Sequence, residues 1–319
     1  MNARIHVVVG ILYNLTKDKV LITKRTGKQF LAGYWEFPGG KVENNEDSFT
    51  ALRREFFEEL GVNLKSAKGL MKISHDYSNK KVLLDVWEID EWEGIPASLE
   101  GQEMIWSNKS NLFKYKFPEA DKHIIKTLNL PNIYGISDEY YKDYSYLFST
   151  VRNYFNSGLK IFQLRLQLGA NKISKKNIEE LHVEAKRNNS TLILNGIASD
   201  VELYAIDGIH LKSKELLKYE SRPISEDYIL GASCHTEAEI EQAEKLCVDY
   251  IFISPVFATN SHPNKIPLGW NNFQQLAKQA DLPVYALGGM SPDDLKKAKE
   301  NGAYGVAMIS YIKSLSLSE

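Results

Sequence analysis

The 319-residue chain has little cysteine, no long apolar run and almost no net charge. Its two cysteines, Cys234 and Cys247, are too few for a disulfide framework at this length, which favours the reducing cytoplasm. No apolar run approaches the roughly 18 residues that a membrane helix needs, and the first residues form no signal-peptide pattern. The net charge of −2 creates no basic field for a nucleic-acid polymer. We therefore expect a cytoplasmic globular protein that binds neither a membrane nor a nucleic-acid polymer.

The first part of the chain alternates β-rich runs with helical patterns. One strong helical pattern spans 47–60, where Asp47 or Ser48 can cap the start and Gly61 suits the end. A second helical pattern lies near 120–128. We expect an α/β/α sandwich with a mixed sheet, whose β-rich runs lie at 5–12, 20–22 and 81–89.

The rhythm changes after Pro131, which disfavours helical geometry at Leu130. Eight short apolar runs then alternate with helical stretches, which is typical of a parallel (β/α)8 TIM barrel. The barrel would be smaller than the usual minimum of roughly 200 residues, so some helices must be short or missing. We expect two domains, 1–130 and 133–319. The runs lie at 133–136, 160–166, 191–194, 208–211, 228–232, 250–253, 283–287 and 304–309.

Three carboxylates share one face of the helical pattern at 47–60. Glu55, Glu58 and Glu59 are spaced i, i+3 and i+4, and only Arg54 lies at their edge. Such carboxylates repel one another by roughly a few tenths of a kcal/mol per exposed pair. A divalent cation would remove the repulsion, and oxygen ligands of this kind suit Mg²⁺ or Mn²⁺. Taken alone, the triplet also fits an ordinary solvated helix face.

The residues around the triplet resemble the signature of the Nudix hydrolases. That signature is a glycine, five residues, a glutamate, seven residues, and then Arg-Glu-apolar-x-Glu-Glu-x-Gly-apolar. So many fixed positions make a chance match far less plausible than for a lone glycine motif. The chain matches at Gly40, Glu46, Arg54, Glu55, Phe56, Glu58, Glu59, Gly61 and Val62.

The resemblance implies a Mg²⁺-dependent hydrolase of nucleoside diphosphates linked to another moiety. Arg54 would orient the carboxylates, and Glu46 would support the junction between loop and helix. Metal ions neutralise a polyphosphate and lower the pKa of bound water, and a carboxylate then removes the proton. Glu55 is the first candidate for this base and Glu100 the second. The implied metal ligands are Gly40 through its carbonyl, Glu55, Glu58, Glu59 and Glu100.

The first half also resembles the MutT branch of the family, which hydrolyses 8-oxo-dGTP to the monophosphate and pyrophosphate. Asp121 stands where that branch has an asparagine that contacts the purine edge. An ionised aspartate only accepts hydrogen bonds, whereas asparagine also donates, so Asp121 cannot donate to the O6 of a guanine unless it is protonated. Asp121 also suits a helix N-cap. The expected substrate contacts are Lys24, Arg25, Phe37, Lys41 and Asp121.

The second half resembles thiamin phosphate synthase and its TenI-like relatives over nearly all of 133–319. The resemblance implies a phosphate site near the end of the barrel, where glycines expose backbone N–H groups. We expect it to include Ser233, Gly288, Gly289 and Ser310. The matching stretches lie at 163–165, 194–195, 207–211, 231–236, 254–259, 287–290 and 305–310.

Several residues depart from the synthase pattern. Gln167 replaces a lysine, and Ser261 with His262 replaces a threonine–lysine pair. Gly196 replaces an aspartate that would bind Mg²⁺, and Glu215 stands at the second such position. Lost lysines remove charge that would offset a pyrophosphate, and a lost aspartate removes a metal ligand. We therefore expect a degenerate barrel that binds phosphate or has a regulatory or structural role.

The remaining polar candidates of the barrel have simpler interpretations. His210 and His235 are expected to be hydrogen-bonded core or rim residues, and Cys234 a small buried residue.

The leading hypothesis is a diphosphatase that acts on a free nucleoside triphosphate, with 8-oxo-dGTP first, in nucleotide-pool sanitation. A second hypothesis is hydrolysis of a thiamin-related pyrophosphate, coupled to a synthase-like activity of the barrel. A third makes the barrel a non-enzymatic sensor of a phosphorylated metabolite. The sequence gives no prediction of the oligomeric state.

Overall fold

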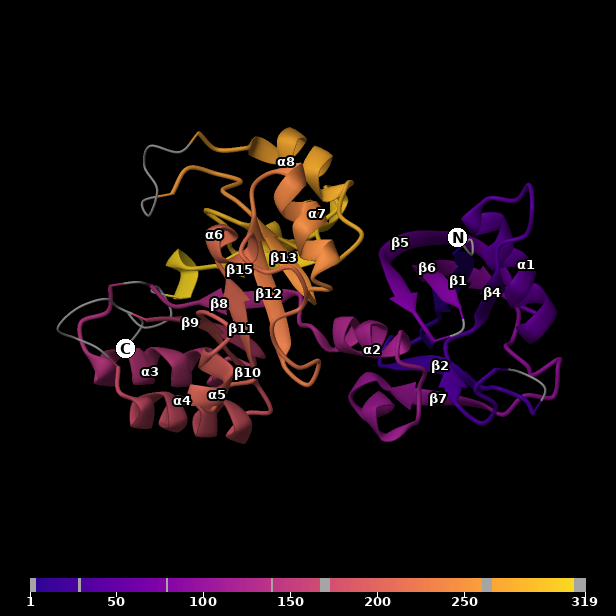
Figure 1. Cartoon of the computed structure of the whole chain (residues 1–319), viewed down its shortest axis with the longest axis horizontal. Helices are drawn as coiled ribbons and strands as arrows, with labels where there is room; N and C mark the ends of the chain where they lie inside the picture. Colours follow the sequence, from indigo (N-terminus) through magenta and orange to yellow (C-terminus); the bar gives the residue numbers. More distant parts are fainter. Residues whose placement is uncertain are drawn as a thin grey trace. The chain divides into compact units, whose positions relative to one another are not determined.

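The computed structural model describes residues 4–27, 30–78, 80–138, 140–166, 173–259 and 266–312. The chain divides into two compact units, Met1–Asn129 and Leu130–Glu319 (Figure 1). Among the described residues, no helix is long and apolar enough to cross a membrane.

The first unit is built on a mixed sheet. Its strands in the described ranges are β1 (Ile5–Ile11), β2 (Lys19–Lys24), β3 (Trp35–Glu36), β4 (Gly39–Lys41), β5 (Asn63–Asp76), β6 (Lys81–Glu93) and β7 (Met104–Asn108). One sheet has the order β4-β1-β6-β5, in which β1 and β6 are parallel and the other pairs antiparallel. A second sheet has the order β3-β2-β7.

Two helices cover opposite faces of the four-stranded sheet. Helix α1 (Ser48–Leu60) packs with Val8 of β1, whereas α2 (Asp121–Asn129) packs in a separate cluster with Val9 of the same strand. Successive side chains of a strand point to opposite faces, so the helices form the outer layers of an α/β/α sandwich. The predicted fold class of this half is confirmed.

Helix α1 begins and ends where the sequence predicts. The Asp47 side chain accepts a hydrogen bond from the Thr50 N–H, which makes Asp47 the N-cap. Gly61 ends the helix in the left-handed region at φ 66°, where a residue with a Cβ is strained. These two ends fix the three glutamates of α1 relative to strand β4.

The second unit is a closed barrel of parallel strands with helices outside it (Figure 1). The predicted barrel is therefore confirmed, in the order β10-β11-β12-β13-β14-β15-β8-β9. Its strands are β8 (Ile133–Ile136), β9 (Ile161–Arg165), β10 (Thr191–Asn195), β11 (Gly208–Leu211), β12 (Ile229–Cys234), β13 (Tyr250–Ile253), β14 (Val284–Leu287) and β15 (Gly305–Met308).

The helices of the barrel differ in length, as its small size predicts. The longer ones are α3 (Tyr144–Asn156), α4 (Lys175–Arg187), α7 (Glu237–Lys245), α8 (Gly269–Ala277) and α9 (Leu295–Glu300). Helices α5 (Asp200–Leu203) and α6 (Ser213–Leu216) have four residues each.

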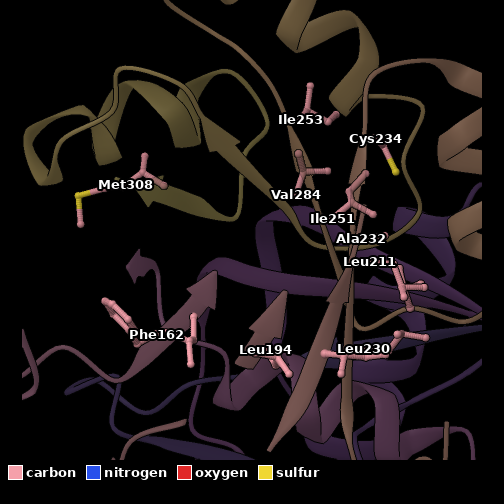
Figure 2. Close-up of a cluster of buried hydrophobic side chains, with 14 of the residues drawn as sticks. Phe162, Leu194, Leu211, Leu230, Ala232, Cys234, Ile251, Ile253, Val284 and Met308 are labelled. Carbon is pink, nitrogen blue, oxygen red and sulfur yellow. The ribbon is translucent and has the colours of Figure 1, made fainter. Parts of the chain in front are cut away.

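The barrel has two hydrophobic regions. The larger one includes aliphatic side chains of the strands, of which Figure 2 shows examples such as Leu194, Leu230 and Ile251. Cys234 lies in this region with no exposed surface, so its interpretation as a small buried residue is confirmed. The other region is rich in tyrosine and includes Tyr134, Tyr250 and Tyr285.

The register between the strands sets the levels inside the barrel. Each inward side chain shares a layer with those of alternate strands. The paired residues place His210 of β11 beside Asn195 of β10 and Gly231 of β12, and the His210 ring packs on Phe252 with ring centroids 4.3 Å apart. Ser233 of β12 lies one layer nearer the carboxyl ends of the strands. Side chains at this level can contact a ligand at that end.

Residues immediately after α2 already belong to the barrel. Leu130 is 6% exposed and packs in the tyrosine-rich region. The Tyr304 hydroxyl donates to the Leu130 carbonyl at 2.7 Å, and the Tyr285 hydroxyl donates to the Pro131 carbonyl at 2.6 Å. The second unit thus begins at Leu130.

Candidate functional site

Two of the three glutamates of α1, Glu55 and Glu58, bond to one arginine. Arg54 donates from Nη1 to Glu55 at 2.7 Å and to Glu58 at 3.3 Å. From Nη2 it donates to Glu46 at 2.7 Å and to the Lys41 carbonyl at 3.0 Å. Arg54 therefore ties the helix to the loop before it and holds two carboxylates in place.

Gly40 lies directly beside the Glu55 carboxylate. A Cβ at position 40 would lie 2.1 Å from the carboxyl carbon of Glu55, closer than real Cβ atoms approach. Strand β4 holds this backbone in place by pairing Gly40 with Val8 of β1. The glycine at this position therefore permits the close approach between strand and carboxylate.

The site carries more negative than positive charge. Burial and the nearby carboxylates of Glu36, Glu55 and Glu100 together raise the pKa of Glu59 to about 8, although a hydrogen bond from the Gly39 backbone opposes them. Burial also raises the pKa of Glu55, although Arg54 opposes it. A cation bound among these carboxylates would favour the ionised form of Glu59 at neutral pH.

A divalent cation fits this donor set chemically. Carboxylate oxygens and a backbone carbonyl are hard ligands of the kind that Mg²⁺ and Mn²⁺ prefer. In the part of the chain that the structure describes, no three His, Cys, Asp or Glu side chains already form a metal-binding group. Arg54 bonds one oxygen of Glu55 and one of Glu58, which leaves the second oxygen of each carboxylate outside these hydrogen bonds.

Glu100 approaches the site from the loop between β6 and β7. It is exposed, and its charge raises the pKa of both Glu55 and Glu59. Gln102 anchors this loop, since its side chain donates to the Glu59 carbonyl at 3.1 Å and accepts from the Glu100 N–H at 3.1 Å. Gln102 is a supporting residue whose role the sequence did not indicate.

The four barrel residues predicted to bind a phosphate lie at the carboxyl ends of the strands. Ser233 is at the end of β12, Gly288 and Gly289 follow β14, and Ser310 follows β15. Both glycines have positive φ, and a Cβ on Gly288 would lie 2.8 Å from the Pro255 Cα. The structure thus brings the four residues to one end of the barrel, the end that holds active sites in this fold.

Comparison with known proteins divides the chain in the same way. A family model described as "NUDIX domain" matches residues 8–127, and one described as "Thiamine monophosphate synthase" matches residues 133–312, more than half of the chain. The chain belongs to both families.

Individual relatives cover one unit each. The "8-oxo-dGTP diphosphatase" of Buchnera aphidicola subsp. Schizaphis graminum is 36% identical over 123 residues, 39% of this chain and 92% of that protein. The "Putative thiamine-phosphate synthase 2" of Aquifex aeolicus is 32% identical over 187 residues, 57% of this chain and 98% of that protein. A solved MutT structure, from work on Aliivibrio salmonicida and Vibrio cholerae, is 34% identical, with a TM-score of 0.35, and covers 40% of this chain and 97% of its own.

Family membership makes the first unit a Nudix hydrolase that acts on phosphorus-containing anhydrides. Nudix hydrolases generally need a divalent metal ion, which agrees with the excess of carboxylates beside Gly40.

Two cations predicted to contact the substrate of the Nudix unit have partners in the protein. Lys24 pairs with Glu103 at 2.9 Å. Arg25 pairs with Glu36 at 2.6 Å and donates to the Phe30 carbonyl at 2.8 Å, which closes the loop between β2 and β3. Both side chains therefore have a structural role in this conformation.

The other predicted contacts of the Nudix unit differ in exposure. The Lys41 side chain is exposed, and its backbone carbonyl accepts from Arg54. Phe37 is 3% exposed and packs on Phe117, with ring centroids 5.4 Å apart, so Phe37 is a core residue.

Asp121 is buried in the Nudix unit, as the first residue of α2 rather than the residue before it. Its exposure is 6%. Burial, opposed by the Arg25 guanidinium and assisted by the Glu36 carboxylate, raises the pKa of Asp121 to about 7. A protonated Asp121 donates as well as accepts, so it can match the asparagine that the MutT pattern places here.

A lysine that the sequence did not single out lies over two aromatic rings of the first unit. Lys80 Nζ is 3.9 Å from the ring centroid of Phe30 and 5.6 Å from that of Tyr77. The Tyr77 hydroxyl is 3.5 Å from the Ala120 N–H, next to Asp121 in the chain. Burial lowers the pKa of Lys80, and the charges of Arg25 and Lys41 lower it further. Phe30, Tyr77 and Lys80 thus form one wall, of which Tyr77 lies next to the start of α2 at Asp121.

In the synthase-like barrel, Gly196 leaves space for the side chain of Asp200. A Cβ there would lie 2.1 Å from Asp200 Oδ2, which accepts the Ile197 N–H at 2.7 Å. Glu215 pairs with Lys218 at 2.7 Å. Gln167, Ser261 and His262, the other departures from the family pattern, lie outside the described residues.

We expect the substitution Gly196→Asp to destabilise the barrel, because the new side chain overlaps the Asp200 carboxylate. Overpacking of this kind costs about 1–3 kcal/mol. Thermal unfolding of the full chain would measure the loss, and the double variant Gly196→Asp with Asp200→Gly should recover most of it. A single variant as stable as the wild type would contradict the steric argument.

Proposed function

We propose that the Nudix unit hydrolyses a (deoxy)nucleoside triphosphate, with 8-oxo-dGTP as the leading substrate, to the monophosphate and pyrophosphate. The observation that carries the proposal is the pair Glu55 and Glu59, two partly buried carboxylates of which Glu55 lies beside Gly40, and whose pKa values are raised by burial and by neighbouring carboxylates. The Buchnera 8-oxo-dGTP diphosphatase supports this substrate, since its similarity covers 92% of that protein.

The acidic residues have distinct roles in this proposal. Glu55, Glu58 and Glu59, with the Gly40 carbonyl and Glu100, would hold Mg²⁺ or Mn²⁺. When bound, the metal neutralises the polyphosphate and lowers the pKa of its water. Glu55 is the first candidate to accept the water proton and Glu100 the second. Arg54 would keep the carboxylates aligned through its bonds to Glu55 and Glu58.

The wall of Phe30, Tyr77 and Lys80, in which Tyr77 lies next to the start of α2, supports a purine substrate. Aromatic rings stack on a base, and a cation beside them favours electron-rich groups. Asp121 would contact the purine edge, and its pKa of about 7 leaves both the accepting and the donating form available near neutral pH. The free nucleotide, rather than a polymer, is the expected partner.

The proposed function is tested by ranking kcat/KM for 8-oxo-dGTP, dGTP and a thiamin-type pyrophosphate on the full chain. We expect 8-oxo-dGTP to lead by at least about tenfold, the size of one well-placed polar contact. Removing divalent metal with EDTA should abolish turnover, and adding Mg²⁺ should restore it. A thiamin-type pyrophosphate that outranks both nucleotides would contradict the proposal.

The fused barrel supports a thiamin-type pyrophosphate as a second candidate substrate. Membership of the thiamine monophosphate synthase family makes a thiamin-related pyrophosphate the natural alternative substrate. For the barrel itself we propose phosphate binding at Ser233, Gly288, Gly289 and Ser310, in a regulatory or structural role. The replaced residues at positions 167, 196 and 261–262 argue against full synthase activity.

A further inference from the structure

A chain of hydrogen bonds crosses the interior of the barrel and ends at Ser233. His210 Nε2 lies 2.8 Å from Ser233 Oγ, and His210 Nδ1 lies 3.3 Å from the Tyr250 hydroxyl. The Tyr250 hydroxyl lies 2.6 Å from that of Tyr134. Tyr134, Tyr250 and His210 are buried, whereas Ser233 is only partly buried. This series of hydrogen bonds therefore connects the buried interior of the barrel to the end that holds active sites in this fold.

Gly231 lets Tyr250 reach the histidine. A Cβ at position 231 would lie 2.4 Å from the Tyr250 hydroxyl oxygen, so any other residue would displace the ring. His210 is held from the other side by Phe252, with ring centroids 4.3 Å apart. The position and orientation of the imidazole are thus fixed by packing as well as by hydrogen bonds.

The direction of the hydrogen bonds follows from the buried end of the chain. A buried hydroxyl hydrogen needs an acceptor. Within the described ranges, the Tyr134 hydroxyl has no hydrogen-bond partner except the Tyr250 hydroxyl, so Tyr134 donates to Tyr250. Tyr250 in turn has only His210 left among these residues, and donates to its Nδ1. Nδ1 is therefore an acceptor.

The tautomer of His210 then determines whether Ser233 donates or accepts in the hydrogen bond between them. Burial and the charge of Arg165 together lower the pKa of His210 to about 3. The imidazole is therefore neutral at physiological pH. A neutral imidazole carries one hydrogen, and with Nδ1 accepting, that hydrogen is on Nε2. Nε2 donates to Ser233 Oγ, which leaves the hydroxyl hydrogen of Ser233 free to bond a ligand.

We propose that Tyr134, Tyr250 and His210 are positioning residues that turn the Ser233 hydroxyl hydrogen toward a phosphate oxygen bound at the carboxyl end of the barrel. The proposal rests on the phosphate-binding role proposed above. It adds a basis for specificity, because a serine that already accepts a hydrogen bond favours a ligand atom that accepts one. The oxygens of a phosphate monoester meet this requirement, and an alcohol or amide N–H meets it poorly.

The tautomer of His210 tests the proposal directly. We would record ¹⁵N NMR spectra of the full chain with labelled histidine and assign His210 by the signal lost in His210→Gln. The expected result is hydrogen on Nε2 in the wild type. Tyr250→Phe removes the donor to Nδ1, so the two tautomers should mix. The control Tyr285→Phe changes a neighbouring tyrosine that bonds the Pro131 carbonyl, and should leave the tautomer unchanged.

A titration with inorganic phosphate, followed at the His210 signal, tests the consequence for binding. Ser233→Ala and Tyr250→Phe should each weaken binding by about tenfold, the effect of one hydrogen bond to a charged group. Ser233→Thr should retain binding because it keeps the hydroxyl.

The possible failures are distinguishable. Hydrogen on Nδ1 in the wild type, or unchanged phosphate affinity in Tyr250→Phe, would overturn the positioning role while leaving phosphate binding intact. A wild-type protein whose His210 signal does not respond to phosphate would instead overturn the phosphate-binding role itself. The wild-type tautomer remains informative even if Tyr250→Phe fails to fold.

Discussion

The substitution Glu58→Gln should lower kcat/KM for the nucleoside triphosphate by more than about 100-fold in the presence of Mg²⁺. Losing a residue that merely supports a metal ligand commonly costs 10–100-fold, and losing a ligand should cost more. The fold should tolerate the change, because the Glu58 side chain is 55% exposed and its ion pair with Arg54 is 3.3 Å long. Pyrophosphate release by the full chain is the measurement.

A matched variant separates this effect from a change in surface charge. Glu93→Gln removes the same charge from β6, where the side chain is 69% exposed and pairs with Lys65. It should leave kcat/KM unchanged. Titration of Mn²⁺ should show weaker binding for Glu58→Gln alone. If Glu58→Gln turns over like the wild type, Glu58 has no part in the metal site and the proposed hydrolysis must use other ligands.

Replacing Asp121 by asparagine should stabilise the first unit, and more so at alkaline pH. The pKa of Asp121 in the folded state, about 7, lies above the usual aspartate value of 3.8, so between these pH values the folded state holds a proton that the unfolded state releases. The contribution of Asp121 to the free energy of unfolding is therefore fully present below about pH 4 and is lost as the pH rises toward 7. Above pH 7, the shifted pKa of Asp121 lowers the free energy of unfolding by up to about 4 kcal/mol, given 1.36 kcal/mol per pKa unit.

Tryptophan fluorescence during urea unfolding would measure this gain. The first unit contains Trp35, Trp87, Trp92 and Trp106, four of the five tryptophans of the chain, so the signal reports mainly on that unit. Asp121→Asn should gain most at pH 8 and much less at pH 5. The exposed control Asp90→Asn should give the same small change at both values. An equal gain at both pH values for Asp121→Asn would show that Asp121 does not titrate in this range.

The same residue should give the wild-type enzyme a pH dependence that asparagine removes. Above pH 7 the ionised Asp121 loses its ability to donate, so kcat/KM for an 8-oxo-purine substrate should fall relative to that of Asp121→Asn. The ratio of the two enzymes, rather than either profile alone, isolates Asp121 from the titration of the catalytic carboxylates.

Local sequence was enough to predict the helix that carries the glutamates. The caps at Asp47 and Gly61 and the spacing of Glu55, Glu58 and Glu59 all depend on residues within one or two turns. The order of the barrel strands was equally accessible, because alternation of apolar runs and helical stretches is a short-range pattern.

Features that depend on distant parts of the chain could not be predicted. Lys80 lies in a turn with nothing to distinguish it, and only folding brings it over Phe30, 50 positions earlier in the numbering. The burial that shifts the pKa of Asp121 is likewise tertiary. Sequence spacing also gave no sign that Asp200 fills the space beside Gly196.

The start of the barrel at Leu130 sets a practical limit on dividing the protein. Helix α2 ends at Asn129, and the next residue is already packed in the barrel, so no spacer separates the units along the chain. A fragment that begins at residue 133 would lack the two carbonyls to which Tyr304 and Tyr285 donate, and burying the Tyr285 hydroxyl without this acceptor would destabilise the barrel. Any attempt to express or exchange one unit should therefore cut between Asn129 and Leu130.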